Sequence, residues 1–325
     1  MKKVIFIVPY FGKLPNYFQV FLNSCEPNTG FKWVILTDDQ TEYRWPENVQ
    51  KINMSFSQLQ QRIQNKFDFP ICLPTPYKLC DYKPTYGYIF EDMLEGYPFW
   101  GYCDIDTIMG NLNDFLPINT LNRYDKLFEL GHMTIFRNSF ENNRLFMKSI
   151  HNKEVYKKVL STEKIMIFDE VNSMSRININ DIFRENNKKI LATDYSFNVS
   201  VTPTAFVRVV YDAQKNSFVP KSRLKNQVVI WKKNNGIRLY FEKNKEVLYK
   251  NYLYIHLQQR KMNVKADSQS EILEIIPNEI ISIPALPNSL SMLKKIKKRG
   301  VSFHRIRILW KWKISKKIKK LRGRK

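Results

Sequence analysis

The N-terminal part of the chain alternates continuous apolar runs with polar turns. Residues 4–8 form an apolar, β-branched run that ends in Pro-Tyr-Phe-Gly, and residues 33–37 form a second such run. Between them, in residues 17–25, apolar side chains recur at helical spacing. Continuous apolar runs are typical of strands that are covered on both faces of a parallel sheet. The pattern therefore predicts a β-α-β unit with a right-handed crossover.

The alternation of strands and helices continues along the chain. Residues 99–103 form a further apolar run that leads directly into an acidic turn, and we expect a buried strand there. The other predicted elements are a strand at 48–54, a polar helix at 57–65 capped by Ser55 or Ser57, strand segments within 126–137, a helix at 141–158 and an antiparallel region from 190 to 254. This order indicates an α/β fold whose mostly parallel central sheet is flanked by helices.

Sheets of this kind bind ligands in the crevice outside the carboxyl ends of their strands. The turns after the first two strands, residues 9–13 and 37–40, would line that crevice together. A nucleotide is the usual occupant. Polar residues that directly follow apolar runs are therefore the first candidates for a site.

The motif Asp104-Ile105-Asp106 follows the run 99–103. On a strand, side chains two residues apart point the same way, so both carboxylates would face the crevice. Two hard oxygen ligands beside a diphosphate suit Mg²⁺ or Mn²⁺. The alternative is a turn with two solvated aspartates. His256 also follows an apolar segment, and its imidazole would make a third ligand for Mn²⁺, although a single histidine is more often structural.

A second acidic pair, Asp169-Glu170, stands at the end of the apolar run 165–168. A carboxylate at a strand end of such a crevice is placed to act as a general base or nucleophile. The alternative is an exposed helix cap.

Two groups of cations accompany the acidic motifs. Lys78 and Lys83 flank Asp81, and Arg260 and Lys261 follow His256. Both groups are candidates for contact with diphosphate oxygens. For the first group the alternative is a solvated helix face.

The charge of the chain is concentrated at its C-terminal end. The 325 residues carry a net charge of +23, and residues 290–325 contain 16 Lys and Arg without one Asp or Glu. One helical face of this segment is apolar and consists of Phe303, Ile306, Trp310, Ile314, Ile318 and Leu321. The pattern predicts a basic amphipathic helix that lies on an anionic membrane surface. The alternatives are a helix packed on its own domain and nucleic-acid binding, for which no fold signature is found.

Several classes of protein lose support from what the sequence lacks. The four cysteines show no C-x-x-C spacing and are expected to be reduced. Pro9 and Gly12 interrupt the first apolar run, and no stretch approaches about 18 apolar residues, so we expect a cytoplasmic chain. P-loop, dinucleotide-binding, hydrolase-elbow and zinc-finger motifs are absent from the sequence.

Taken together, these residues resemble the GT-A class of nucleotide-sugar glycosyltransferases, and more closely a bacterial family of uncharacterised capsule and lipopolysaccharide glycosyltransferases. The resemblance covers about residues 4 to 262. The matching pieces are, in chain order, Val8-Pro9-Tyr10-Phe11-Gly12, Leu36-Thr37-Asp38-Asp39, Tyr77 to Pro84 with Tyr86-Gly87, Trp100 to Asp106, Gly131-His132 with Arg137-Asn138, Phe168-Asp169-Glu170, and His256 with Gln258, Arg260 and Lys261.

The resemblance implies a GT-A domain over residues 1–265, a linker at 266–289 and a membrane-associating tail at 290–325. It also implies roles for individual residues. The base, ribose and diphosphate of a nucleotide sugar would contact Pro9, Tyr10, Phe11, Gly12, Asp38, Lys78, Asp81, Lys83, Asp104, Arg260 and Lys261. Asp104, Asp106 and His256 would hold Mn²⁺ or Mg²⁺, and His132 would contact the donor sugar or the acceptor.

Asp169 and Glu170 would be the catalytic residues. Retaining transferases of families 8 and 32 carry an Asp-Gln pair at this position, whereas inverting enzymes use an acidic residue as base. The departure from Asp-Gln leaves the anomeric outcome open.

The sequence thus predicts a metal-dependent transferase that moves a hexose from a nucleoside-diphosphate sugar, expected to be a UDP-sugar, to a surface polysaccharide or lipid-linked glycan. The tail would hold it on the inner face of the cytoplasmic membrane. A noncatalytic membrane scaffold of a polysaccharide-assembly complex is the alternative, and no nucleic-acid partner is expected.

Overall fold

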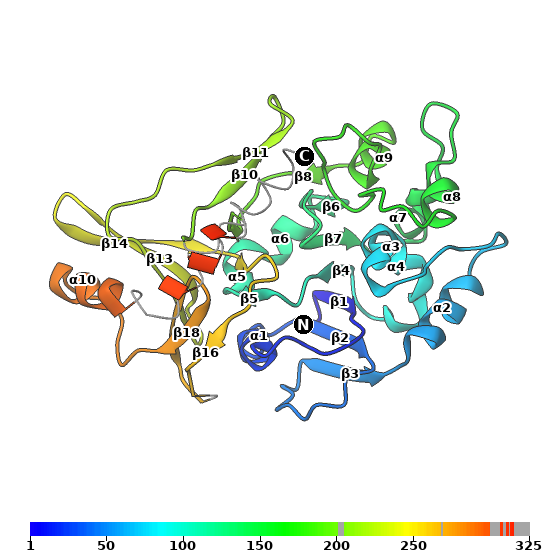
Figure 1. The fold of residues 1–325 in the computed structure, drawn as a ribbon. Helices are drawn as coiled ribbons and strands as arrows, with labels where there is room; N and C mark the ends of the chain where they lie inside the picture. The colour runs from blue at the N-terminus through cyan, green and yellow to red at the C-terminus, as the bar shows by residue number, and fades with distance from the viewer. Residues whose placement is uncertain (201–204, 268, 300–305, 308–309, 312, 315–325) are drawn as a thin grey trace.

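The computed structural model describes residues 1–200, 205–267, 269–299, 306–307, 310–311 and 313–314 (Figure 1). A central seven-stranded sheet has the order β3-β2-β1-β4-β7-β6-β8. Its strands are β1 (Val4–Pro9), β2 (Phe31–Thr37), β3 (Val49–Asn53), β4 (Phe99–Cys103), β6 (Lys126–Leu127), β7 (Met133–Arg137) and β8 (Ile190–Leu191). Strands β3, β2, β1 and β4 run parallel, and β7 is antiparallel to β4. The predicted α/β class with a mostly parallel central sheet is confirmed.

Helices cover both faces of this sheet. They are α1 (Phe18–Cys25), α2 (Phe56–Gln64), α3 (Leu79–Tyr82), α4 (Tyr86–Ile89), α5 (Leu112–Phe115), α6 (Ile118–Leu121), α7 (Phe140–Arg144), α8 (Val155–Leu160) and α9 (Ile179–Glu185). One core cluster joins the sheet to α2, α3, α4, α8 and α9, and another joins it to α1, α5 and α6. Helix α1 connects β1 to β2 as predicted, and Ser55 caps α2 in a reciprocal capping box.

The sheet explains why its strands read as continuous apolar runs. In β1, Ile5 and Ile7 pack into one of these clusters, and Val4, Phe6 and Val8 pack into the other. Successive residues of a strand point to opposite faces, so a strand covered on both faces has no polar positions.

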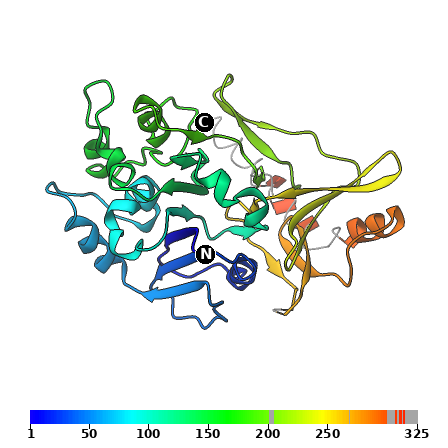
Figure 2. The same cartoon turned by 180° about the vertical axis from the view of Figure 1, so that it is seen from behind.

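A second sheet of six strands lies beside the first (Figures 1 and 2). Its strands are β12 (Val228–Lys232), β13 (Gly236–Lys243), β14 (Glu246–Tyr252), β16 (Asn263–Val264), β17 (Ile272–Ile276) and β18 (Glu279–Ser282). Segment 266–289, which was expected to be a linker, therefore contains two strands of this sheet, because β17 pairs with both β12 and β18.

Helix α10 (Leu290–Arg299) packs on the second sheet. Leu293 and Ile296 are buried against Val228, Ile230 and Tyr240, whereas Lys294, Lys295, Lys297 and Lys298 are exposed. The first part of the predicted tail is thus amphipathic, and its apolar side faces its own domain. Of the predicted apolar face, Ile306, Trp310 and Ile314 are exposed, and Phe303, Ile318 and Leu321 lie outside the described residues.

Two small sheets complete the fold. Strand β15 (Tyr254–His256) lies between β5 (Thr107–Met109) and β9 (Phe197–Asn198). The hairpin of β10 (Val209–Asp212) and β11 (Ser217–Pro220) forms a two-stranded sheet of its own. The first of these sheets matters for the site, because it brings residues from three distant parts of the chain together.

The predicted helix at 141–158 is interrupted. Helix α7 continues as a short 3₁₀ turn (Leu145–Met147), and α8 begins only at Val155. Between them, His151 and Asn152 have φ angles of 49° and 59°, and a right-handed helix cannot pass through residues in the left-handed region.

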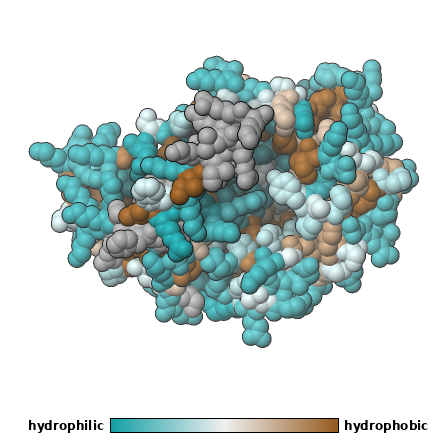
Figure 3. All heavy atoms as spheres, in the orientation of Figure 1, coloured by the Kyte–Doolittle hydropathy of each residue, from teal (hydrophilic) through white to brown (hydrophobic). Residues whose placement is uncertain are grey.

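The face shown in Figure 3 is mostly hydrophilic, with scattered hydrophobic patches. In the part of the chain that the structure describes, every helix is too short or too polar to cross a membrane.

Candidate functional site

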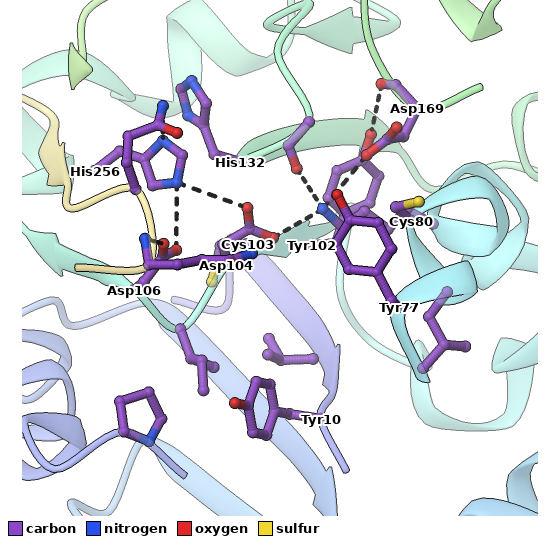
Figure 4. A pocket seen from close by; sticks show the side chains of 18 of the residues that line it. Tyr10, Tyr77, Cys80, Tyr102, Cys103, Asp104, Asp106, His132, Asp169 and His256 are labelled. Atoms are coloured by element: carbon purple, nitrogen blue, oxygen red, sulfur yellow. Dashed lines mark hydrogen bonds and ion pairs between the residues drawn. The ribbon is translucent and has the colours of Figure 1, made fainter. Parts of the chain in front are cut away.

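A pocket of about 1340 Å³ lies at the carboxyl ends of β1 and β4 (Figure 4). Pro9, Tyr10 and Phe11 line it from the turn after β1, and Asp104 and Asp106 line it from the turn after β4. Ligand pockets usually measure about 300–1000 Å³, so this one has room for two substrates.

Asp104, Asp106 and His256 form a cluster with the chemistry of a metal site. One ligand atom from each residue lies within 4.8 Å of the other two. His256 Nε2 is 3.3 Å from Asp106 Oδ1 and 3.9 Å from Asp104 Oδ2. Two carboxylates and one imidazole fit a divalent ion such as Mn²⁺.

The neighbours of the cluster keep its ligand atoms oriented. Asn198 Oδ1 lies 3.1 Å from His256 Nδ1, and a proton on Nδ1 leaves the Nε2 lone pair facing the carboxylates. The backbone N–H of Gln259 donates to Asp106 Oδ2, so Oδ1 remains for a metal. These contacts are those expected around ligands of a metal ion.

Strand pairing places the third ligand. His256 pairs with Thr107 across β15 and β5, and with Asn198 across β15 and β9. Asp104 and Asp106 themselves lie in the turn between β4 and β5, not on a strand as the alternation argument assumed. A tight turn brings both carboxylates to the same side.

The charges in the cluster influence each other. Burial disfavours the ionised form of Asp106, but His256 and the Gln259 N–H outweigh it and hold the pKa of Asp106 below its usual value. Burial likewise opposes a charged His256, but Asp106 raises its pKa above the ordinary range. Both shifts favour the charged form of the residue concerned.

Lys83 connects this cluster to the second acidic pair. Its Nζ is 2.8 Å from Asp104 Oδ1, 2.8 Å from the Gly131 carbonyl oxygen and 3.4 Å from Asp169 Oδ2. Burial works against the charge of Lys83, but Asp104 and Asp169 raise its pKa well above the usual value. Lys83 thus lines the pocket as an ion-paired residue.

Asp169 and Glu170 also line the pocket. Burial raises the pKa of Asp169 to about 7, with Lys83 opposing and Glu170 adding to the shift. The pKa of Glu170 is also raised, because burial outweighs the hydrogen bond from the Gly131 N–H, which lies 2.8 Å from Glu170 Oε2 and favours the ionised form. Residues 165–168 form no strand, and Asp169 is buried in a loop, so neither the strand-end placement nor the exposed helix cap is observed.

Gly131 is the residue that lets the acidic pair approach the backbone. A Cβ at this position would lie 2.4 Å from Asp169 Oδ2 and 3.2 Å from Glu170 Oε2. Any side chain here would displace the carboxylates.

Lys78 and Asp81 do not line the pocket. Both side chains are fully buried, and Lys78 Nζ lies 2.7 Å from Asp81 Oδ2. The remaining bonds of Lys78 are to the carbonyl oxygens of Val159 and Lys164. The structure therefore places this pair behind the pocket, where neither side chain is exposed to solvent.

The other predicted residues are divided between the pocket and its surroundings. His132, Arg260 and Lys261 line the pocket; the Arg260 guanidinium donates to the Ser200 carbonyl oxygen. His132 Nδ1 is 2.6 Å from the Tyr254 hydroxyl, and its ring lies at a tilt of 34° to that of His256, with 4.5 Å between the ring centroids. Asp38 and Gly12 lie outside the lining, where Asp38 accepts a 2.7 Å bond from the Gly12 N–H and fixes the turn after β1.

Sequence reasoning missed Asn198, Gln259 and Tyr77 as site residues. Asn198 lies beside His256 because β9 pairs with β15, and Gln259 lies in the turn that follows β15. Neither residue is part of a recognisable motif. Tyr77 lines the pocket with 67% of its surface exposed. Its position next to a predicted cation was the available signal.

A family model described as "Family of unknown function (DUF6625)" matches residues 6–284. A comparison with curated proteins gave no match. Among solved structures, the chain is similar to the galactosyltransferase LgtC in complex with donor and acceptor sugar analogs, with 12% identity over 62% of this chain and 76% of that chain and a TM-score of 0.36. An active-site mutant of LgtC shows 11% identity over 62% of this chain and 76% of that chain, with a TM-score of 0.36. The glycosyltransferase GlyE of Streptococcus pneumoniae TIGR4 shows 11% identity over 50% of this chain and 44% of that chain, with a TM-score of 0.26.

Proposed function

We propose that this chain, which belongs to the DUF6625 family of unknown function, is a metal-dependent glycosyltransferase that moves a hexose from a nucleoside-diphosphate sugar to a glycan acceptor. The observation that carries the proposal is the Asp104-Asp106-His256 cluster in a pocket of about 1340 Å³ that also holds the Asp169-Glu170 pair. The carboxylates of Asp104 and Asp106 suit a metal ion, and those of Asp169 and Glu170 suit proton transfer.

In this proposal the donor lies at the metal end of the pocket. Mn²⁺ or Mg²⁺ held by Asp104, Asp106 and His256 would neutralise the diphosphate as it leaves. Tyr10 and Phe11 line the pocket and would contact the base and ribose of a UDP-sugar. Arg260 and Lys261 are the pocket cations nearest in sequence to His256, and they would meet diphosphate oxygens.

The acidic pair would act on the other substrate. Asp169 or Glu170 takes the proton of the acceptor hydroxyl, or stabilises the positive charge that develops on the donor sugar. A pKa of about 7 for Asp169 suits proton transfer near neutral pH. Tyr77 and Phe218, both exposed, line this same pocket and offer aromatic faces on which an acceptor sugar ring can stack.

Nucleotide-dependent stabilisation tests the proposal. We expect UDP, tested beside GDP and CMP, to raise the melting temperature only when Mn²⁺ is present, because the diphosphate is held through the metal. Differential scanning fluorimetry of the full chain measures this shift. No shift with any nucleotide would favour the alternative, a noncatalytic scaffold of a polysaccharide-assembly complex.

We also propose that the chain acts on the inner face of the cytoplasmic membrane. The supporting observation is helix α10, whose exposed lysines lie on the side away from the second sheet. Each cation near an anionic leaflet contributes about 1 kcal/mol.

Sedimentation with vesicles checks this second proposal. The full chain should co-sediment with vesicles that contain phosphatidylglycerol and not with neutral phosphatidylcholine vesicles. Replacing Lys294, Lys295, Lys297 and Lys298 with glutamine should weaken the binding, while matched changes at Lys215, Lys221, Lys243 and Lys245 should not. Equal binding to both kinds of vesicle would contradict an electrostatic attachment.

A further inference from the structure

The Lys78-Asp81 pair has no part in the pocket, yet it contacts the loop that carries the acidic pair. We propose that Asp81, neutralised by Lys78, is a positioning residue that holds Ile167 in a left-handed conformation and thereby places Asp169 and Glu170 in the pocket. This inference rests on the proposed function, because it assigns the position of the proposed catalytic carboxylates.

Ile167 has an unusual backbone conformation. Its φ angle is 57°, in the left-handed region that β-branched residues avoid because of the clash between Cβ and the backbone. Such a conformation persists only where surrounding contacts hold it. Ile167 lies two residues before Asp169 and lines the pocket.

Asp81 supplies the contacts that hold it. Its Oδ2 accepts the N–H of Met166 at 2.8 Å, and its Oδ1 accepts the N–H of Phe168 at 2.9 Å. One fully buried carboxylate thus binds the two backbone N–H groups that flank Ile167. A single rigid group bonded on both sides fixes the direction of the chain between them.

Lys78 extends this anchor. Its Nζ binds Asp81 Oδ2 and the carbonyl oxygen of Lys164, each at 2.7 Å. Residues 164–168 belong to no helix or strand, so side chains satisfy backbone groups that secondary structure would otherwise satisfy. Lys78 and Asp81 come from the 3₁₀ turn Pro76–Lys78 and from α3 and are rigidly placed by the core.

The loop is fixed on the other side of the acidic pair as well. The Val171 N–H donates to the Glu129 carbonyl oxygen at 3.0 Å, and Glu170 Oε2 accepts the Gly131 N–H. Asp81 supplies the corresponding fixed point before the pair. Loss of Asp81 should therefore let Ile167 relax to negative φ and rotate the carboxylates away from Gly131.

The test uses two variants, Asp81→Asn and the double variant Lys78→Met/Asp81→Asn. The double variant removes both charges, so that no buried lysine is left without its carboxylate. An asparagine keeps one acceptor atom and loses the other. At a temperature where both variants are folded, we expect Mn²⁺-dependent UDP binding to be unchanged and kcat to fall about 100-fold, as displacements of about 1 Å can cause.

Two further measurements make the test specific. In the Asp81→Asn background, Ile167→Asn should restore part of kcat, because asparagine tolerates the left-handed region better than isoleucine. Amide hydrogen exchange should become faster at Gly131, whose N–H reports the position of Glu170, and this readout needs no activity. Glu279→Gln, at a buried carboxylate of the second sheet paired with Lys265, is the matched control and should change neither kcat nor the exchange of Gly131.

The outcomes separate the two proposals. The positioning role is overturned if the Asp81 variants fold and keep either the kcat or the Gly131 amide exchange of the wild type. It is also overturned if Ile167→Asn restores no part of the lost kcat. Absence of Mn²⁺-dependent nucleotide binding in the wild-type chain overturns the proposed function instead, and Gly131 exchange still decides the role of Asp81.

Discussion

Replacing Asp106 with alanine should lower turnover about 1000-fold, equivalent to about 4 kcal/mol of transition-state stabilisation. Asp106 is almost fully buried, and its Oδ1 lies 3.3 Å from His256 Nε2. A water molecule would therefore not take the place of its carboxylate as a metal ligand. The change also leaves the Gln259 N–H without its acceptor. Steady-state transfer from UDP-hexoses, measured across Mn²⁺ concentrations, checks the expectation.

The variant should remain folded, because Asp106 is replaced by a smaller side chain at the edge of a pocket. The melting temperature without ligand should fall moderately, because His256 and the Gln259 N–H lose a buried partner, and the Mn²⁺-dependent shift with UDP should disappear. Asp68→Ala, at an exposed aspartate outside the pocket, should retain both activity and shift. Full activity of Asp106→Ala would exclude Asp106 as a metal ligand.

Asp169→Asn should lose activity and gain stability at alkaline pH. The pKa of Asp169 is about 7 in the folded chain because of burial, and an unfolded aspartate has a pKa of about 3.9. Between these values the folded state holds a proton that the unfolded state has released. The contribution of Asp169 to the stability of the wild type should therefore fall by up to about 1.4 kcal/mol per pH unit from about pH 4 to about pH 7 and then level off.

Asparagine has the same shape and no charge to bury, so the variant lacks this decline. Its advantage over the wild type should grow between about pH 4 and pH 7 and be largest at about pH 8. Urea unfolding at several pH values measures the difference, and turnover at about pH 7 should be about 100-fold or more below wild type. A variant that is less stable than the wild type at about pH 8 would show that Asp169 is ionised and well paired.

Much of the central sheet was predictable because its signals are local. The runs at 4–8, 33–37 and 99–103 became β1, β2 and β4, and the pocket lies at the carboxyl ends of β1 and β4, whereas the turn after β2 does not line it. A strand covered on both faces must be apolar throughout, and this is visible in a single sequence.

The sites of Lys78 and Asp81 show where local reasoning stops. A lysine and an aspartate three residues apart on a short helix suggest a solvated face or a ligand contact. Their burial depends on the loop at 164–168, which lies more than eighty residues away and has no secondary structure of its own. The segment 266–289 was misread for a related reason, since β17 is short and pairs with β12, about forty residues upstream, while β18 pairs with β17.

The sheet that unites β5, β15 and β9 also bears on how the protein is made. The three ligands of the metal cluster come from residues 104, 106 and 256, and the residue that orients His256 is at 198. Contacts between such distant residues form late in folding, because the entropy of closing a long loop is lost before the contacts stabilise the chain. A nascent chain that has folded its central sheet therefore still lacks the Asp104-Asp106-His256 cluster until β15 has left the ribosome.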